Sequence, residues 1–272
     1  MHRAIRFRAG VIATPFALLA LATAFAHDTW LISGRAKIPQ GTTVTLDLTS
    51  GMAFPVLETS IKSERIARAK CRLSSHTFDL KDFTSGPKSL RLRARMDEPG
   101  IATLWVELKP RTLELTPDKV REYLDEIDAP KSIREQWANS PGPRRWREAY
   151  TKHSKTFIRV GDPASDKSWA EPVGMGLEIV PDQDPTSLRT GDAVSFVVLK
   201  NGAPLPDFSL DLVREGASKG TARKTDREGR AQFAMGKAGR WLMRGTELRK
   251  STQPGVEWES DFTTLTLWVA AK

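Results

Sequence analysis

His27 combines a metal-binding residue type with a position that makes it a chelator. It directly follows Ala24-Phe25-Ala26, and this small-x-small tripeptide is the form of site that signal peptidase cleaves. Cleavage there makes His27 the first residue of the mature chain, so its α-amine and imidazole Nδ1 can close a six-membered ring on one metal ion. Nitrogen ligands of this kind suit Ni(II), Co(II) and Cu(II). We therefore predict that His27 anchors a divalent transition metal.

The residues before His27 are typical of a secretory signal peptide. Arg3, Arg6 and Arg8 give a basic beginning, and the apolar run 11–21 is shorter than the roughly 20 residues that span a bilayer. No cysteine follows this run and no arginine pair precedes it, which favours the general secretory route. We predict that residues 1–26 are removed and that the protein is periplasmic. No later stretch is long and apolar enough for a transmembrane segment.

Two further histidines remain after the predicted cleavage, and both are candidate metal ligands. A third nitrogen from His153 or His76 would complete a three-nitrogen site with His27. His153 lies among aromatic residues, where a hydrogen-bonded core histidine is the ordinary alternative, and His76 lies at a predicted turn before a strand. We rank the candidates His27, His153 and His76. Asp28 and Glu247 could add oxygen ligands, although solvated carboxylates are the simpler interpretation.

Catalytic functions receive little support from the sequence. We expect no Gly-x-Ser-x-Gly nucleophile elbow, and the chain contains no His-Glu-x-x-His motif and no glycine-rich phosphate loop. A histidine brace at the N-terminus can support copper oxygenase chemistry, so a polysaccharide oxidase is one alternative. An adhesion or assembly module of β-sandwiches without metal is another. We expect a protein that is not an enzyme, but captures a metal ion and delivers it to a membrane permease.

The composition indicates an exported all-β protein with a mixed surface. Removing 26 residues from 272 leaves 246, enough for one large domain or two smaller ones. Three arginines leave with the signal, so the formal charge falls from +9 to +6, with 39 basic against 33 acidic residues spread along the chain. A nucleic-acid partner is therefore not expected. Cys71 is the one cysteine, which excludes an intramolecular disulfide and predicts a buried thiol.

Residues 27–115 have the pattern of a sandwich of short β-strands. Apolar residues alternate in 43–48 and 90–94, and 101–108 is a longer apolar run. Trp30-Leu31-Ile32 is a predicted strand that would hold His27 in place. Short turn signals separate these stretches. We predict an antiparallel, Ig-like sandwich.

Residues 116–155 are predicted as a helical insertion between two sandwiches. Thr116 and Pro117 are typical of a helix start. The apolar residues that follow share one helix face: Val120, Tyr123, Leu124 and Ile127. A second helix is predicted after Pro143 from residues spaced at i, i+4, i+7 and i+11: Trp146, Tyr150, His153 and Phe157.

Residues 156–272 return to strands and predict a second antiparallel sandwich. Asn201-Gly202 is a strong signal for a two-residue hairpin. The segment 191–243 reads GD-x-VSFVVLKNGAPLPD…TDREGRAQF…GRWLM. This pattern resembles the carboxypeptidase-regulatory or transthyretin-like sandwich. The resemblance implies architecture and leaves function open.

A wider resemblance covers nearly the whole mature chain. Its pieces are AHDTWL, TSGMAFP at 49–55, REAYTKHSKTFIRVG at 147–161, LEIVPDQDP at 177–185 and WESDFTTLTL at 258–267. Their order resembles an exported bacterial family of unknown function, described as the periplasmic component of ABC-type cobalt or nickel transport systems. The resemblance implies a mature chain that begins at His27, and it includes His153. A histidine or methionine of some members is replaced here by Thr246-Glu247-Leu248, which argues against a soft ligand there.

Overall fold

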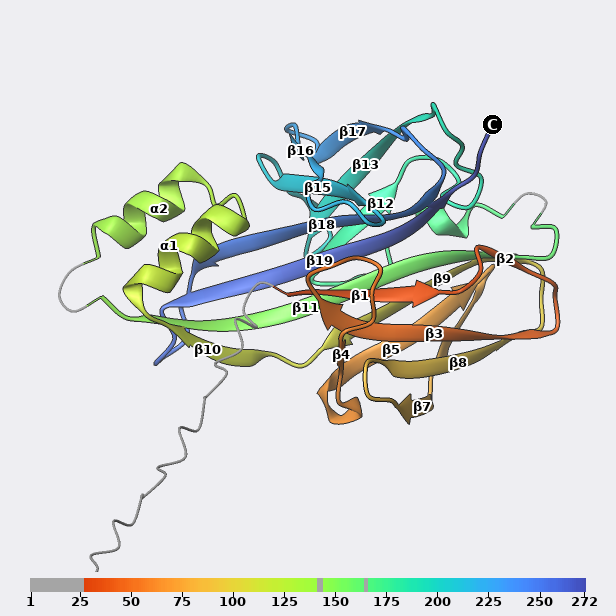
Figure 1. The fold of residues 1–272 in the computed structure, drawn as a ribbon, viewed down its shortest axis with the longest axis horizontal. Helices are drawn as coiled ribbons and strands as arrows, with labels where there is room; N and C mark the ends of the chain where they lie inside the picture. The colour runs from red at the N-terminus through yellow and green to blue at the C-terminus, as the bar shows by residue number, and fades with distance from the viewer. Residues whose placement is uncertain (1–26, 141–143, 164–165) are drawn as a thin grey trace, which may run out of the picture.

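The computed structural model describes residues 27–140, 144–163 and 166–272. The predicted signal peptide, residues 1–26, lies outside the described residues. In the described part the strands form three sheets of ten, five and four strands, which pack as sandwiches (Figure 1). The expected mainly β, sandwich-like fold is therefore confirmed.

The ten-stranded sheet runs through the middle of the molecule. Its main path contains, in spatial order, β16 (Thr221–Lys224), β15 (Ser209–Arg214), β18 (Gly239–Lys250), β19 (Trp258–Val269), β11 (Trp146–Val160), β9 (Gly100–Leu108), β5 (Ile66–Leu73) and β6 (His76–Asp79). Two further strands, β10 (Arg111–Leu115) and β2 (Lys37–Ile38), pair with β11. Strands β11 and β19 run parallel, whereas we expected antiparallel neighbours.

The two smaller sheets pack on opposite faces of this central sheet. The five-stranded sheet contains β1 (Asp28–Ser33), β3 (Thr42–Gly51), β8 (Leu90–Met96), β7 (Asp82–Ser85) and β4 (Thr59–Ser60). The four-stranded sheet contains β12 (Leu177–Pro181), β13 (Ala193–Lys200), β14 (Ala203–Pro204) and β17 (Arg230–Ala234). Short 3-10 helices lie at Ser63–Arg65 and Ser168–Ala170.

Strand β11 contributes to two separate apolar cores. Successive side chains of a strand point to opposite faces of its sheet. Ile158 packs with Leu46 under the five-stranded sheet, whereas its neighbour Phe157 packs with Phe196 under the four-stranded sheet. The two sandwiches therefore share one sheet, and the predicted boundary between residues 155 and 156 falls inside β11. The limits 27–115, 116–155 and 156–272 stay predictions.

Two helices cover one end of the central sheet, at the left of Figure 1. They are α1 (Pro117–Glu126) and α2 (Lys131–Ala138). The predicted apolar stripe of α1 is confirmed, because Val120, Tyr123 and Leu124 are buried. Beneath the helices the rings of Trp146 and Trp258 stack with their centroids 4.5 Å apart.

The helix predicted after Pro143 is wrong, because residues from Trp146 onwards form β11. Trp146 and Tyr150 are an even number of residues apart, as are His153 and Phe157. The two pairs lie on opposite faces of the strand, where a helix would align all four. The competing signal was the β-branched and aromatic content of TFIRV at 156–160, which favours a strand.

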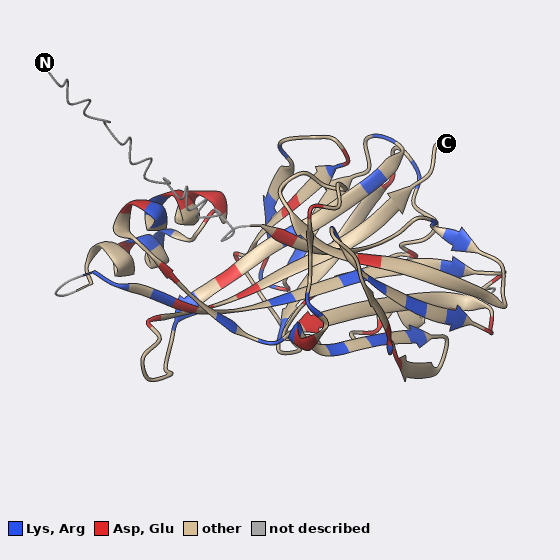
Figure 2. Cartoon of the chain, turned by 60° about the horizontal axis from the view of Figure 1, so that its bottom comes forward, with Lys and Arg blue, Asp and Glu red and all other residues tan. Residues whose placement is uncertain are grey.

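Other local predictions hold. Asn201 and Gly202 have φ of 50° and 83° and join β13 to β14, as a two-residue hairpin turn requires. Cys71 is buried and free. Lys and Arg are interspersed with Asp and Glu over the strands and helices (Figure 2). No helix in the described ranges is long and apolar enough to cross a membrane.

Because both sandwiches share strand β11, we predict that they unfold together as one cooperative unit. Replacing Phe157 or Ile158 with alanine should each lower the free energy of unfolding by about 2–5 kcal/mol, since each leaves a cavity in a core. Both variants should shift one common transition in urea unfolding followed by tryptophan fluorescence and circular dichroism. Arg93→Ala, an exposed position on β8, should change stability by less than about 0.5 kcal/mol. Two transitions, each moved by one variant alone, would contradict a shared sheet that unfolds as one unit.

Candidate functional site

The three candidate histidines lie at separate places in the fold. His27 precedes β1, His153 lies within β11, and His76 begins β6 at the edge of the central sheet. Lys152 donates a hydrogen bond from Nζ to the carbonyl oxygen of His27, so His27 lies over the face of β11 to which Lys152 points. His153 points to the opposite face, where its ring approaches Gly176. The structure therefore does not bring the three histidines together.

Both ring nitrogens of His153 face carboxylates. Its Nδ1 lies 3.2 Å from Glu107 Oε2, and its Nε2 lies 2.9 Å from Asp261 Oδ1. The residue is 3% exposed. Burial lowers the pKa of His153, but the two carboxylates outweigh it and raise the pKa above the ordinary value. This arrangement favours the imidazolium form of His153, which can donate to both carboxylates and has no nitrogen lone pair for a metal.

The partners of His153 are themselves ion-paired. Arg68 contacts Glu107. Asp261 accepts hydrogen bonds from Lys200 Nζ and, at 2.8 Å, from Arg249 Nη1. Burial raises the pKa of Asp261, but the hydrogen bonds from His153 and Lys200 outweigh it and hold the pKa well below its usual range. The resulting network of alternating charges connects strands of two sheets through the middle of the protein.

A second buried ion pair lies further along β11. Lys155 Nζ is 2.8 Å from Glu178 Oε1, and both side chains are 1% exposed. Glu178 also accepts hydrogen bonds from the backbone N–H groups of Val173 and Gly174. The pair thus joins β11 to the loop before β12 and fixes that loop to the central sheet.

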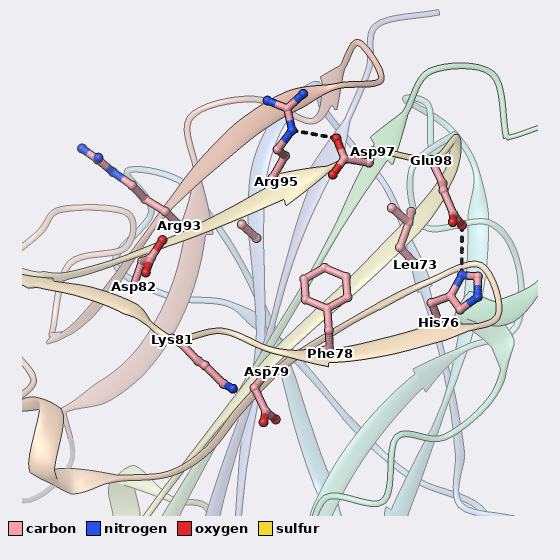
Figure 3. A pocket seen from close by; sticks show the side chains of 11 residues that line it. Leu73, His76, Phe78, Asp79, Lys81, Asp82, Arg93, Arg95, Asp97 and Glu98 are labelled. Carbon is pink, nitrogen blue, oxygen red and sulfur yellow. Dashed lines mark hydrogen bonds and ion pairs between the residues drawn. The ribbon is translucent and has the colours of Figure 1, made fainter.

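His76 lies at a surface cavity of about 420 Å³ in the first sandwich (Figure 3). Its side chain is 68% exposed, and its Nδ1 is 3.0 Å from Glu98 Oε2. Phe78 points into the cavity, and Arg95 is hydrogen-bonded to Asp97 at its rim. The cavity wall mixes both signs of charge, so it shows no selection for a metal cation.

The backbone around His27 is held firmly. Its carbonyl accepts the hydrogen bond from Lys152, and the carbonyl of Thr29 accepts hydrogen bonds from Ser154 Oγ at 2.7 Å and Thr264 Oγ1 at 2.6 Å. Burial lowers the pKa of Lys152 to about 8. The strand predicted directly after His27 is confirmed as β1, and it positions His27.

A cavity of about 530 Å³ opens beside Asp28, between β1, the end of α1, and strands β15, β16 and β18. Its walls carry more carboxylates than bases, so its potential favours cations. The carboxylates belong to Asp28, Asp125, Glu126, Asp128 and Asp211, and the bases to Lys219 and Arg244.

Two carboxylates of this cavity, those of Asp28 and Glu126, have a raised pKa. Burial raises the pKa of Asp28 more than Arg244, 2.6 Å away, lowers it. Partial burial and the nearby Asp28 carboxylate raise the pKa of Glu126. Carboxylates with a shifted pKa in a cavity are typical of functional sites. The solvated interpretation of Asp28 and Glu247 is wrong, because Asp28 pairs with Arg244 and Glu247 with Arg249.

The cavity wall carries one Gly-x-Ser-x-Gly pattern, so the expectation that the sequence lacks this motif is wrong. Residues 216–220 read GASKG, which has the spacing of a nucleophile elbow. An elbow leads from a strand into a helix, whereas this segment joins the antiparallel strands β15 and β16. The pattern is therefore a hairpin turn.

Within the described residues no group of three or more His, Cys, Asp and Glu side chains is arranged to hold a metal ion. The α-amine of His27, the second nitrogen of the proposed chelate, would become free only if the chain were cleaved directly before His27. A site at this position therefore depends on the α-amine that processing releases.

The charge of His153 predicts a pH-dependent stability. Its contribution should be complete below pH 6.5, the ordinary pKa of histidine, and should be lost as the pH rises through the higher folded pKa. His153→Gln should cost about 3–5 kcal/mol of unfolding free energy at pH 6, and less at pH 9. Urea unfolding across this range measures the difference. His76→Gln is the exposed control, and a cost for His153→Gln that does not change with pH would show that His153 is not charged.

Comparison with known proteins places the chain in a family. No curated protein matches it. The D0-D1 domain of intimin is 11% identical, with a TM-score of 0.21, over 88% of this chain and 97% of that chain. The adhesin InvE of Yersinia pseudotuberculosis is 12% identical, with a TM-score of 0.23, over 88% of this chain and 58% of that chain. At such TM-scores the likeness carries no argument about function. The model of the family described as "Domain of unknown function (DUF4198)" matches residues 24–246, and the chain belongs to that family.

Proposed function

We propose that the protein is a periplasmic, non-enzymatic binding protein that captures a divalent transition metal at the free N-terminus of His27. The observation that carries the proposal is the position of this residue. His27 is held by Lys152, and its neighbour Asp28 lines the negatively charged cavity. The released α-amine, the imidazole and a cavity carboxylate would form a nitrogen and oxygen donor set that suits Ni(II), Co(II) or Cu(II).

The ordered strand after His27 supports the proposal energetically. A chelating group that is already held in place loses less conformational freedom when it binds. The hydrogen bonds to Thr29 from β11 and β19 hold the backbone two residues from the chelate. His153 then has a structural role, because it stabilises the strand beneath the terminus from the opposite face. His76 has no part in the site.

The sequence resemblances give the proposal its setting. The likeness to exported components of cobalt or nickel transport systems suggests an accessory of metal uptake that delivers its ion to a membrane permease. The transthyretin-like pattern of the second sandwich fits a binding role, since such folds host binding and scaffold functions.

The first prediction is that cleavage occurs between Ala26 and His27. The intact mass of protein purified from the periplasm should correspond to residues 27–272, and N-terminal sequencing should begin His-Asp-Thr-Trp. A different first residue would remove the chelating amine from His27 and would contradict the proposed site.

The second prediction concerns the chelate itself. Adding one glycine before His27 keeps the imidazole but displaces the amine, so Ni(II) and Cu(II) affinity should fall about tenfold or more. Calorimetric titration of the two folded proteins measures the change. His76→Ala, which keeps the native terminus, should bind like the unaltered protein.

Equal affinities of the extended and native proteins would place any metal elsewhere. Absence of binding by the correctly processed protein would overturn the proposal. The adhesion or assembly module would then be the remaining interpretation of the two sandwiches.

A further inference from the structure

We propose that Met52 supplies a thioether sulfur at the metal site of His27, and that the site therefore binds Cu(I) in addition to the divalent ions. This inference rests on the proposed metal site and names a further ion that the site accepts. Thioether ligands favour Cu(I), whereas Ni(II) and Co(II) prefer nitrogen and oxygen donors.

The strand register places Met52 opposite His27. Strands β1 and β3 are antiparallel, and their last pair in register is Asp28 with Gly51. The next residues outward are His27 and Met52. Directly opposite residues of an antiparallel pair have Cβ atoms about 4.5–5.5 Å apart where the pairing continues. This separation allows one metal ion to be shared between the two side chains.

The side chains of this register position fall on a common face. Thr29 and Ser50 pair with one another, and their hydroxyl oxygens are hydrogen-bonded. Residues two positions further along each strand return to the same face. For β1 that residue is His27, and for β3 it is Met52.

The exposure of Met52 is unusual for this chain. Its side chain is 60% exposed, whereas the other four methionines of the described residues are at most 1% exposed: Met96, Met175, Met235 and Met243. A methionine that fills a core needs no accessible sulfur, but a ligand does.

The loop after β3 is built to present Met52. The carboxylate of Glu58 accepts hydrogen bonds from the backbone N–H groups of Met52 and Ala53, each at 2.9 Å. Phe54 is buried, and its ring lies edge-on to Trp30 with the centroids 5.7 Å apart. Both anchors hold the loop beside β1, so the backbone that carries the exposed Met52 side chain has a fixed position at the open end of the strand pair.

The test compares ions on the processed protein. Cu(I) affinity is measured without oxygen by competition with the chelator bicinchoninate, and Cu(II) and Ni(II) affinities by calorimetry. Met52→Leu keeps an apolar side chain of similar size but removes the sulfur. It should weaken Cu(I) binding about tenfold or more and change Cu(II) and Ni(II) binding less than about twofold. Val56→Leu, at another exposed apolar position of the same loop, is the matched control and should change none of them.

A second readout follows the sulfur directly. Dilute peroxide should oxidise Met52 ahead of the four buried methionines, and Ag(I), a redox-stable substitute for Cu(I), should protect it. Peptide mass spectrometry measures each sulfoxide. Cu(I) affinity unchanged by Met52→Leu, or Ag(I) binding that leaves Met52 equally oxidisable, would overturn the inference. The glycine extension separates the two proposals: if it weakens Cu(II) and Ni(II) binding while Met52→Leu affects no ion, the metal site at His27 stands and the thioether does not.

Discussion

Five consecutive polar residues of strand β11, residues 152–156, are buried in the middle of a ten-stranded sheet. Each buried charge costs several kcal/mol unless a partner meets it, and alternate residues of a strand require partners on opposite faces. The carbonyl of His27 meets Lys152 on one face, while Glu107 and Asp261 meet His153 on the other. The arrangement of the surrounding sheets follows from this requirement, since their strands bring both sets of partners to one place.

The sequence was sufficient where local patterns decide the structure. Alternating apolar residues predicted β3 and β8, and continuous apolar stretches predicted β1 and β9. Asn201-Gly202 predicted its hairpin because the turn needs positive φ at both positions. The predicted helix from Trp146 onwards was wrong, because the three aromatic residues and one histidine on which it rested fit a helical spacing by chance. Pairing with β19 and β9 decided in favour of a strand. The pairing with β19 joins residues 110 positions apart, such as Glu148 and Trp258, and the pairing with β9 joins residues 54–60 positions apart, so no local window contains either.

The candidate site shows the same division. His27 became a candidate ligand from the tripeptide before it, because a signal-peptidase site is recognised from adjacent residues. The partners of His153 are 46 and 108 residues away in the sequence. The residues next to His153 therefore do not predict them. The role of Asp28 was likewise misjudged, since its partner Arg244 comes from a strand near the other end of the chain. Met52 became a candidate only through the register of β1 with β3.

The contact between β1 and β19 constrains the order in which this chain can fold. The carbonyl of Thr29, near its N-terminus, accepts a hydrogen bond from Thr264 of the last strand, β19. A chain that emerges from a ribosome or an export channel with its N-terminus first exposes β1 long before β19 is available. Contacts of such large sequence separation form late and slowly. The first strand can pair with β3 early, but its contact with β19 forms only when the last strand is in place. A chain truncated before β19 would therefore leave the Thr29 carbonyl without the Thr264 hydroxyl.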